Sequence, residues 1–261
     1  MTTRELTIVL RNFAVGTNLD ALRMLRRPRA MAAYVTECLF LRRCLHPGKD
    51  LPQRGVWEVF GVDSSLPIVL HGAEASPYWF GPVASFTADL VAMCMLCQII
   101  RPKLIFEIGT FHGSGALHWA SNAPDAEVYT LDLPQKCLPA LSTTQVDKLY
   151  IRQQRNGKRL LFDQKREASR IHCLYGDSAQ FDYTAFLGRV DLFFIDGAHS
   201  YEYVRSDTLH ALACCHPGSV IAWHDYGRVG FNGVSHWLRE FAAQGREIYR
   251  VPGGSLAYMR V

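Results

Sequence analysis

Residues 106–115 read Phe-Glu-Ile-Gly-Thr-Phe-His-Gly-Ser-Gly (FEIGTFHGSG), and this stretch decides how the whole sequence is interpreted. It extends an apolar run that begins at Leu104, and it leads into a helical pattern over residues 114–123. An apolar run, a glycine-rich turn and a helix in this order predict the first strand–turn–helix unit of a parallel sheet. In such a unit the backbone of the turn usually lies against a nucleotide.

The alternation of apolar runs and helical patterns continues to the end of the chain. Two apolar segments, 246–251 and 255–261, are separated by a Pro-Gly-Gly turn and predict an antiparallel pair at one edge. Strands that alternate with helices are typical of an α/β fold with a doubly wound, mostly parallel sheet. The further predicted elements are strands at 127–132, 170–176, 190–196 and 219–225 and helices at 200–215 and 231–244.

The beginning of the chain and one internal segment depart from this alternation. Helical patterns at about 19–45 and 82–100 flank a Pro/Gly-rich connection, so residues 1–80 are predicted to form an N-terminal helical extension that covers one end of the sheet. Residues 81–261 then form the nucleotide-binding domain. Residues 134–169 interrupt this domain between its second and third strands, and so long a connection predicts a substrate-binding element or lid.

Composition limits the class of protein. Of 261 residues, 49% are hydrophobic and 20% are charged, which is typical of an ordinary globular protein. No apolar run reaches the ~20 residues that span a bilayer, and the N-terminus lacks the cleavage pattern of a signal peptide. Eight cysteines in a chain with a large core are interpreted as reduced thiols, so a cytoplasmic location is expected.

Basic residues concentrate near the N-terminus. Residues 1–54 hold ten Lys/Arg against four Asp/Glu, whereas the formal net charge of the whole chain is +4. We interpret this cluster as a solvated helix face, with a patch for an anionic substrate or partner as the alternative. No nucleic-acid motif accompanies it, so no nucleic-acid partner is expected. A homodimer through the N-terminal helices is expected because symmetric dimers are common.

The glycine spacing argues against a dinucleotide. The dinucleotide fingerprint is G-x-G-x-x-G, and Phe111 and Ser114 stand at its second and third glycine positions. Glu107 is also expected near the mouth of the strand. At about 4 Å and an effective dielectric of 20, a carboxylate repels a phosphate by ~4 kcal/mol, whereas it attracts an ammonium group. The turn therefore predicts a ligand with a positive charge and no phosphate.

S-adenosylmethionine meets this description, and over about residues 80–261 the sequence resembles the class I S-adenosylmethionine-dependent methyltransferases. The resemblance implies a Rossmann-like sheet of seven mostly parallel strands. It also implies a cofactor site along the ends of the first four strands, which contact the methionine, the ribose, the adenine and the sulfonium in turn. The matching residues are Glu107, Gly109, Thr110, Gly113 and Gly115, then Asp132, then Asp177 and Ser178, and finally Asp196.

Two later stretches, IDGAHSYEYVRSD (195–207) and PGSVIAWHDY (217–226), resemble one subgroup of this family. The subgroup contains natural-product sugar O-methyltransferases and cephalosporin-hydroxylase-like proteins. The resemblance implies a divalent metal at Asp196, His224 and Asp225. A histidine at 224 is a softer ligand than Mg²⁺ prefers, so Mn²⁺, Fe²⁺, Zn²⁺ or no metal are the alternatives to Mg²⁺.

The chemistry explains why these groups would be needed. A hydroxyl group is a poor nucleophile until a histidine or a metal withdraws its proton. His199 and His224 are the candidate bases, and Asp196 and Asp225 are candidates for orienting the base or binding metal. The predicted function is O-methylation of a small molecule, a natural product or sugar. The alternatives are an enzyme that binds S-adenosylmethionine without transferring its methyl group, a non-catalytic partner protein that retains the pocket and, last, a metal-dependent hydrolase.

Overall fold

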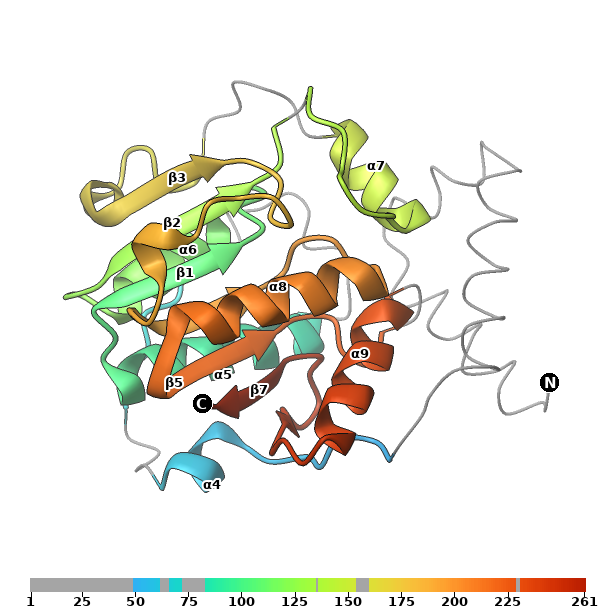
Figure 1. Cartoon of the computed structure of the whole chain (residues 1–261). Coiled ribbons are helices and arrows are strands. Elements are labelled where there is room, and N and C mark those ends of the chain that lie inside the picture. Colours follow the sequence, from blue (N-terminus) through green and yellow to red (C-terminus); the bar gives the residue numbers. More distant parts are fainter. Residues whose placement is uncertain (1–48, 62–65, 72–82, 135, 154–159, 229–230) are drawn as a thin grey trace.

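The computed structural model describes residues 49–61, 66–71, 83–134, 136–153, 160–228 and 231–261 (Figure 1). The helical pattern predicted over about residues 19–45 lies outside these ranges. Within them, the chain forms one sheet with helices on both of its faces (Figure 1).

The described strands form a single seven-stranded sheet in the order β3-β2-β1-β4-β5-β7-β6. The strands β1 to β5 are parallel, and β7 is antiparallel to both of its neighbours, β5 and β6. This arrangement confirms the predicted α/β fold with its antiparallel edge. The strands are β1 (Leu104–Ile108), β2 (Glu127–Asp132), β3 (Ile171–Tyr175), β4 (Val190–Ile195), β5 (Cys215–Trp223), β6 (Tyr249–Arg250) and β7 (Ala257–Arg260).

Helices cover the two faces of the sheet (Figure 1). α5 (Val83–Ile100) and α6 (Ser114–Asn122) lie on one face, and α8 (Tyr201–Cys214) and α9 (Asn232–Ala243) lie on the other. Successive side chains of a strand point to opposite faces. Accordingly, Ile105 packs in the core beneath α5 and α6, whereas Phe106 packs in the core beneath α8 and α9. The sheet is therefore buried on both faces, as apolar parallel strands require.

β5 begins earlier than its sequence predicts. The Pro217-Gly218 pair was expected to separate the preceding helix from a strand over 219–225, but both residues lie inside β5. Cys215 pairs with Val190, and the register with β4 then shifts before it becomes regular. Gly218 has a φ of +97°, which glycine adopts without a steric penalty. An irregularity of this kind lets the strand pass through residues that normally end one.

The predicted insertion carries a helix of its own. α7 (Gln145–Gln153) lies within residues 134–169, and the 3₁₀ helix η2 (Arg166–Arg170) begins there and ends directly before β3. A second 3₁₀ helix, η3 (Thr184–Phe186), follows β3. Thr144 and Asp147 cap the start of α7 reciprocally: the Thr144 N–H donates to Oδ2 of Asp147 and the Asp147 N–H donates to Oγ1 of Thr144. Figure 1 shows α7 beyond the carboxyl ends of β1 and β2, apart from the two helical layers.

The described part of the N-terminal segment packs on the antiparallel edge of the sheet. Gln53 forms a parallel bridge with Arg250, and α4 (Val56–Phe60) follows it. Leu51 and Val56 are both buried, each in a different half of the core. These residues therefore belong to the same packed body as the sheet.

Candidate active site

The predicted site residues follow the carboxyl ends of the parallel strands. The glycine-rich turn (residues 109–113) follows β1, Asp132 ends β2 and Asp177 comes soon after β3. Asp196 follows β4, and His224 follows β5. Ligands of open α/β sheets bind at this edge. The topology therefore brings residues that are far apart in sequence to one side of the molecule.

Close packing explains two glycines of the quoted stretch. Gly109 has a φ of +104°, and a Cβ atom there would lie 2.2 Å from the backbone oxygen of Asp196. Gly115 lies in the first turn of α6, where a Cβ atom would lie 2.1 Å from Oε1 of Glu107. The turn is therefore held tightly between β1, β4 and α6.

Glu107 lies near the carboxyl end of β1, as expected, and its side chain is buried. It packs beneath α6 and is only 1% exposed. The Trp119 indole donates to Oε1 (2.8 Å), and the Thr130 hydroxyl donates to Oε2 (2.6 Å). Burial raises the pKa of Glu107 to about 8 despite these two donors. Thr130 also hydrogen-bonds Thr110, so the Glu107 carboxyl group is linked to the glycine-rich turn through Thr130.

The acid after β3 joins three parts of the chain. Asp177 accepts hydrogen bonds from the Ala140 N–H (2.6 Å), the Tyr203 hydroxyl (2.7 Å) and the Ala179 N–H (2.9 Å). It thereby links the insertion to α8. The neighbouring Ser178 is buried, whereas Asp132, at the end of β2, is half-buried.

The insertion also covers the glycine-rich turn. The Leu161 N–H donates to the carbonyl of His112 (3.0 Å). Phe162 is buried, and its ring lies 2.5 Å from the position that a Cβ atom of Gly113 would take. The turn thus has its neighbouring strands on one side and the insertion on the other.

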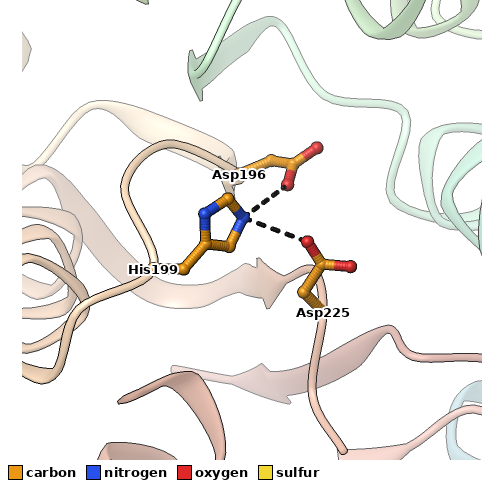
Figure 2. A group of neighbouring side chains, drawn as sticks. All are labelled: Asp196, His199 and Asp225. Atoms are coloured by element: carbon orange, nitrogen blue, oxygen red, sulfur yellow. Dashed lines mark ion pairs between the residues drawn. The ribbon is translucent and has the colours of Figure 1, made fainter. Parts of the chain in front are cut away.

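A histidine and two carboxylates meet where β4 and β5 end (Figure 2). Nε2 of His199 lies 3.0 Å from Oδ2 of Asp225 and 3.9 Å from Oδ1 of Asp196. This nitrogen is buried, and no hydrogen bond of good geometry reaches it from the described residues. The three ligand atoms lie within 4.8 Å of one another, so their geometry and donor chemistry fit a divalent cation.

The other ring nitrogen of His199 is held by a residue to which the sequence analysis gave no role. Nδ1 lies 2.7 Å from Oδ1 of Asp147, and the backbone N–H of His199 donates to both oxygens of that carboxylate (3.2 Å each). Asp147 belongs to α7 and is 3% exposed. The local capping pattern with Thr144 indicates only the start of a helix, and it gives no sign of the contact with His199, which is 52 positions away.

His224 lies on the other side of the same two carboxylates. Its Nδ1 is 3.2 Å from Oδ1 of Asp225 and 3.4 Å from Oδ1 of Asp196. Its Nε2 is 3.3 Å from Oδ2 of Asp89, which belongs to α5. Both predicted bases therefore contact Asp196 and Asp225, and each has a further carboxylate behind its ring.

The charges of the cluster depend on one another. The Arg228 guanidinium donates to Oδ1 of Asp225. Burial would raise the pKa of Asp225, but Arg228 and His224 hold it well below its usual value. Burial would likewise lower the pKa of His199, but Asp147 raises it well above its usual range. These carboxylates therefore favour the charged form of the His199 ring, and a cation bound at Nε2 would replace the proton there.

The turn after β5 is strained and firmly anchored. Asp225 has a φ of +65°, which costs a non-glycine residue on the order of 1–3 kcal/mol and is found mostly at functional sites. The next residue, Tyr226, is fully buried; its N–H donates to the Ser255 carbonyl and its hydroxyl to Asp50. The described N-terminal segment thus helps to hold the carboxylate of Asp225 in place.

A scan against protein-family profiles matches residues 106–226 to the family described as "Methyltransferase domain". The match begins in β1 and ends at Tyr226, so it includes both the glycine-rich turn and the His/Asp cluster. Residues 106–226 form a methyltransferase domain. The predicted enzyme class is thereby confirmed. No curated protein sequence matches the chain significantly.

Solved structures with a similar chain path include several methyltransferases. Cofactor-bound Rv0187 from MTB is 16% identical, with a TM-score of 0.48 and coverage of 100% of this chain and 98% of that one. The calicheamicin methyltransferase CalS11 is 17% identical, with a TM-score of 0.48 and coverage of 67% and 79%. TomG from Streptomyces achromogenes, solved with SAM, is 14% identical, with a TM-score of 0.46 and coverage of 88% and 97%. Similarity at this level carries no argument about the substrate of the methyltransferase domain.

None of the described helices is long and apolar enough to cross a membrane.

Proposed function

We propose that this protein transfers the methyl group of S-adenosylmethionine to a hydroxyl oxygen of a small molecule, a natural product or sugar. The family match supports methyl transfer. The His/Asp cluster supports an oxygen acceptor, because a hydroxyl group needs a partner that withdraws its proton. The observation that carries the proposal is the buried Nε2 of His199, which lies between two carboxylates at the ligand-binding edge.

S-adenosylmethionine would bind along the ends of β1 to β4. The glycine-rich turn would hold its methionine part, and Asp132 would accept from the ribose hydroxyls. Asp177 and Ser178 would hold the adenine. Asp196, whose side chain is one-third exposed, would lie beside the sulfonium. These placements rest on the family resemblance and on the strand ends that carry the residues.

Methyl transfer is an in-line displacement that releases a neutral thioether, so the leaving group needs no acid. The protein must hold the acceptor oxygen in line with the methyl carbon at near-contact distance. His199 takes the proton of the acceptor hydroxyl at Nε2. Its Nδ1 keeps its own proton and donates it in a hydrogen bond to Asp147. Because carboxylates hold the pKa of His199 high, the ring is a strong base once it has lost its Nε2 proton.

Asp196, His199 and Asp225 would hold a divalent metal. When bound there, the metal would lower the pKa of the acceptor hydroxyl. The resemblance implied His224 as a ligand, and its Nδ1 faces the same two carboxylates, so it remains a candidate fourth ligand. One imidazole or two with two carboxylates suits Mn²⁺, Fe²⁺ or Zn²⁺ better than Mg²⁺.

The first experiment measures thermal unfolding with S-adenosylmethionine, S-adenosylhomocysteine or NAD, each with and without EDTA. A ligand at about a hundred times its Kd adds ~2.7 kcal/mol of stability, so a raised midpoint is expected with the adenosyl compounds and none with NAD. Asp132→Ala is expected to weaken this shift. The matched control Asp163→Ala, at an exposed acid of the insertion, leaves it unchanged.

The second experiment identifies the acceptor. The protein is incubated with S-adenosylmethionine and a panel of sugar and phenolic hydroxyl compounds, and S-adenosylhomocysteine is measured. Accumulation that depends on the acceptor supports methyl transfer. Product formation without S-adenosylhomocysteine would point to a non-methylating enzyme of the same fold. Lack of turnover across the panel, together with no adenosyl-dependent shift, would refute the proposal.

We also propose a cytoplasmic location and a homodimer. The cysteines among the described residues are free, and Cys94, Cys97, Cys214 and Cys215 are buried, which suits a cytoplasmic enzyme. The N-terminal helices expected to form a homodimer lie outside the described residues, so the dimer stays a prediction. Light scattering at micromolar concentration tests it, and a monomeric mass would contradict it.

A further inference from the structure

We propose that Asp147 is a positioning residue for His199: the insertion, not the sheet, determines which nitrogen of the histidine ring faces the reacting groups. This inference rests on the proposed role of His199. It gives the insertion a part in catalysis, in addition to its predicted role as a substrate-binding element or lid.

The contacts of Asp147 fix the orientation of the His199 ring. The Asp147 side chain is 3% exposed, and each of its two oxygens accepts a hydrogen bond. Oδ2 accepts from the Thr144 N–H (2.8 Å), and Oδ1 pairs with Nδ1 of His199 (2.7 Å). The backbone N–H of His199 contacts both oxygens, so the carboxylate is fixed relative to the residue that it orients.

This contact selects one form of the ring. A carboxylate only accepts hydrogen bonds, so Nδ1 must carry the proton that it donates to Asp147. When the ring is neutral, Nε2 then presents its lone pair toward Asp196 and Asp225. Only in this form can Nε2 take a proton from an acceptor or bind a metal.

α7 connects this histidine to the cofactor turn. Tyr150 lies three residues after Asp147, and side chains at this spacing share one face of a helix. The Tyr150 ring packs edge-on against Phe111 of the glycine-rich turn, with the centroids 6.1 Å apart. One face of α7 therefore contacts both the turn after β1 and the histidine after β4.

The substitution Asp147→Asn separates this role from a structural one. The Thr144 N–H needs an acceptor, so the amide oxygen of the new side chain takes the place of Oδ2. The NH₂ group then occupies the place of Oδ1 and donates to Nδ1, which moves the ring proton to Nε2. The cap of α7 survives while the form of the ring changes. Asp163→Asn is the matched control, because Asp163 caps the Leu160 N–H in the same insertion.

The full-length protein and both variants are labelled with ¹⁵N-histidine, and long-range ¹H–¹⁵N correlation at alkaline pH reports which ring nitrogen carries the proton. His199→Asn assigns the signal. The wild type and Asp163→Asn are expected to show the Nδ1–H form, and Asp147→Asn the Nε2–H form. Titration calorimetry with Mn²⁺ is expected to show about 10–100-fold weaker binding in Asp147→Asn, as for other losses of a ligand's hydrogen-bond partner.

An unchanged ring form in Asp147→Asn overturns the inference, and so does a Mn²⁺ affinity equal to that of the wild type. Equal losses of Mn²⁺ affinity in Asp147→Asn and Asp163→Asn also overturn it, because they would show that any change in the insertion weakens binding. A thermal shift with S-adenosylhomocysteine that persists in Asp147→Asn shows that the fold is intact. Absence of that shift in the wild type contradicts the proposed function. Absence of Mn²⁺ binding to the wild type contradicts only the proposed metal site. In both cases the position of the ring proton in the histidine spectra still tests the role of Asp147.

Discussion

The two histidines of the site have the same carboxylate neighbours but are supported by different parts of the protein. His199 is held by Asp147 of the insertion, at 2.7 Å. His224 is held by Asp89 of α5, at 3.3 Å, and Asp89 also accepts from the Ser255 N–H, the Ser255 hydroxyl and the Leu256 N–H. The carboxylate behind His224 thus also anchors the turn before β7, whereas the carboxylate behind His199 also caps the start of α7.

This difference assigns different tasks to two similar groups. Asp147 lies at hydrogen-bond distance from the His199 ring (2.7 Å), whereas the contact between Asp89 and the His224 ring is longer (3.3 Å), so the His199 ring is the more firmly oriented of the two. We therefore expect His199 to act on the substrate and His224 to complete the charge balance around Asp196 and Asp225.

The largest expected effect is on kcat, when each of the two histidines is replaced by asparagine in a separate variant. His199→Asn is expected to lower kcat for methyl transfer by about 10²–10⁴-fold, the usual contribution of a general base. His224→Asn is expected to cost clearly less than 10²-fold. Steady-state kinetics with the acceptor found in the panel measures both, and a thermal shift with S-adenosylhomocysteine verifies folding. A larger loss in His224→Asn than in His199→Asn would reverse the assignment.

The supporting acids are expected to contribute similarly to stability. Asp89→Ala leaves the buried donors of Ser255 and Leu256 without an acceptor, and each such group costs about 1–3 kcal/mol, so a total loss of roughly 3 kcal/mol is expected. Asp147→Ala leaves the N–H groups of Thr144 and His199 without an acceptor, so a loss of roughly the same size is expected. Urea denaturation at pH 7 measures both. A loss clearly below about 1 kcal/mol in either variant would mean that its carboxylate is not needed as an acceptor.

The smallest effect is on the pH dependence of stability. Asp147 raises the folded-state pKa of His199 above 6.5, so this pair stabilises the protein fully below pH 6.5 and loses its contribution as the pH rises through the folded pKa. The loss is at most about 1.4 kcal/mol per pH unit. Asp147→Asn is expected to flatten the decline above pH 6.5. Asp89→Asn keeps it, because Asp196 and Asp225 are the groups that raise the pKa of His224. Denaturation series from pH 6 to 10 compare the slopes, and an undiminished slope in Asp147→Asn would argue against the pairing.

Local patterns predicted most of the fold correctly. The strands over 127–132 and 190–196 were expected within one residue of where they lie, because their apolar runs are continuous and end at turn residues. β5 was harder to predict, since its first residues pair with β4 across an irregularity that no local signal marks. The N-terminal helical extension remains a prediction for the residues outside the described ranges.

The positions of candidate residues were predictable wherever a residue ends or follows a strand. Asp132, Asp196 and His224 lie at or directly after the ends of β2, β4 and β5, because the topology of a parallel sheet brings strand ends together, and their roles stay predictions. The burial of the Glu107 side chain was not predictable, since it depends on the space that Gly115 leaves and on the indole of Trp119. Asp147 was missed because an acid inside an insertion has no periodic or strand-end signal.

The sequence by itself determined the order of the elements, the glycine-rich turn and the family to which this turn belongs, because these depend on residues close together in the chain. Only the tertiary structure decided which groups face one another. Residues 147 and 199, or 89 and 224, meet because the insertion and α5 pack against the sheet at particular places. Such contacts depend on the distances and angles between packed elements, and these are set by the whole core rather than by any local stretch.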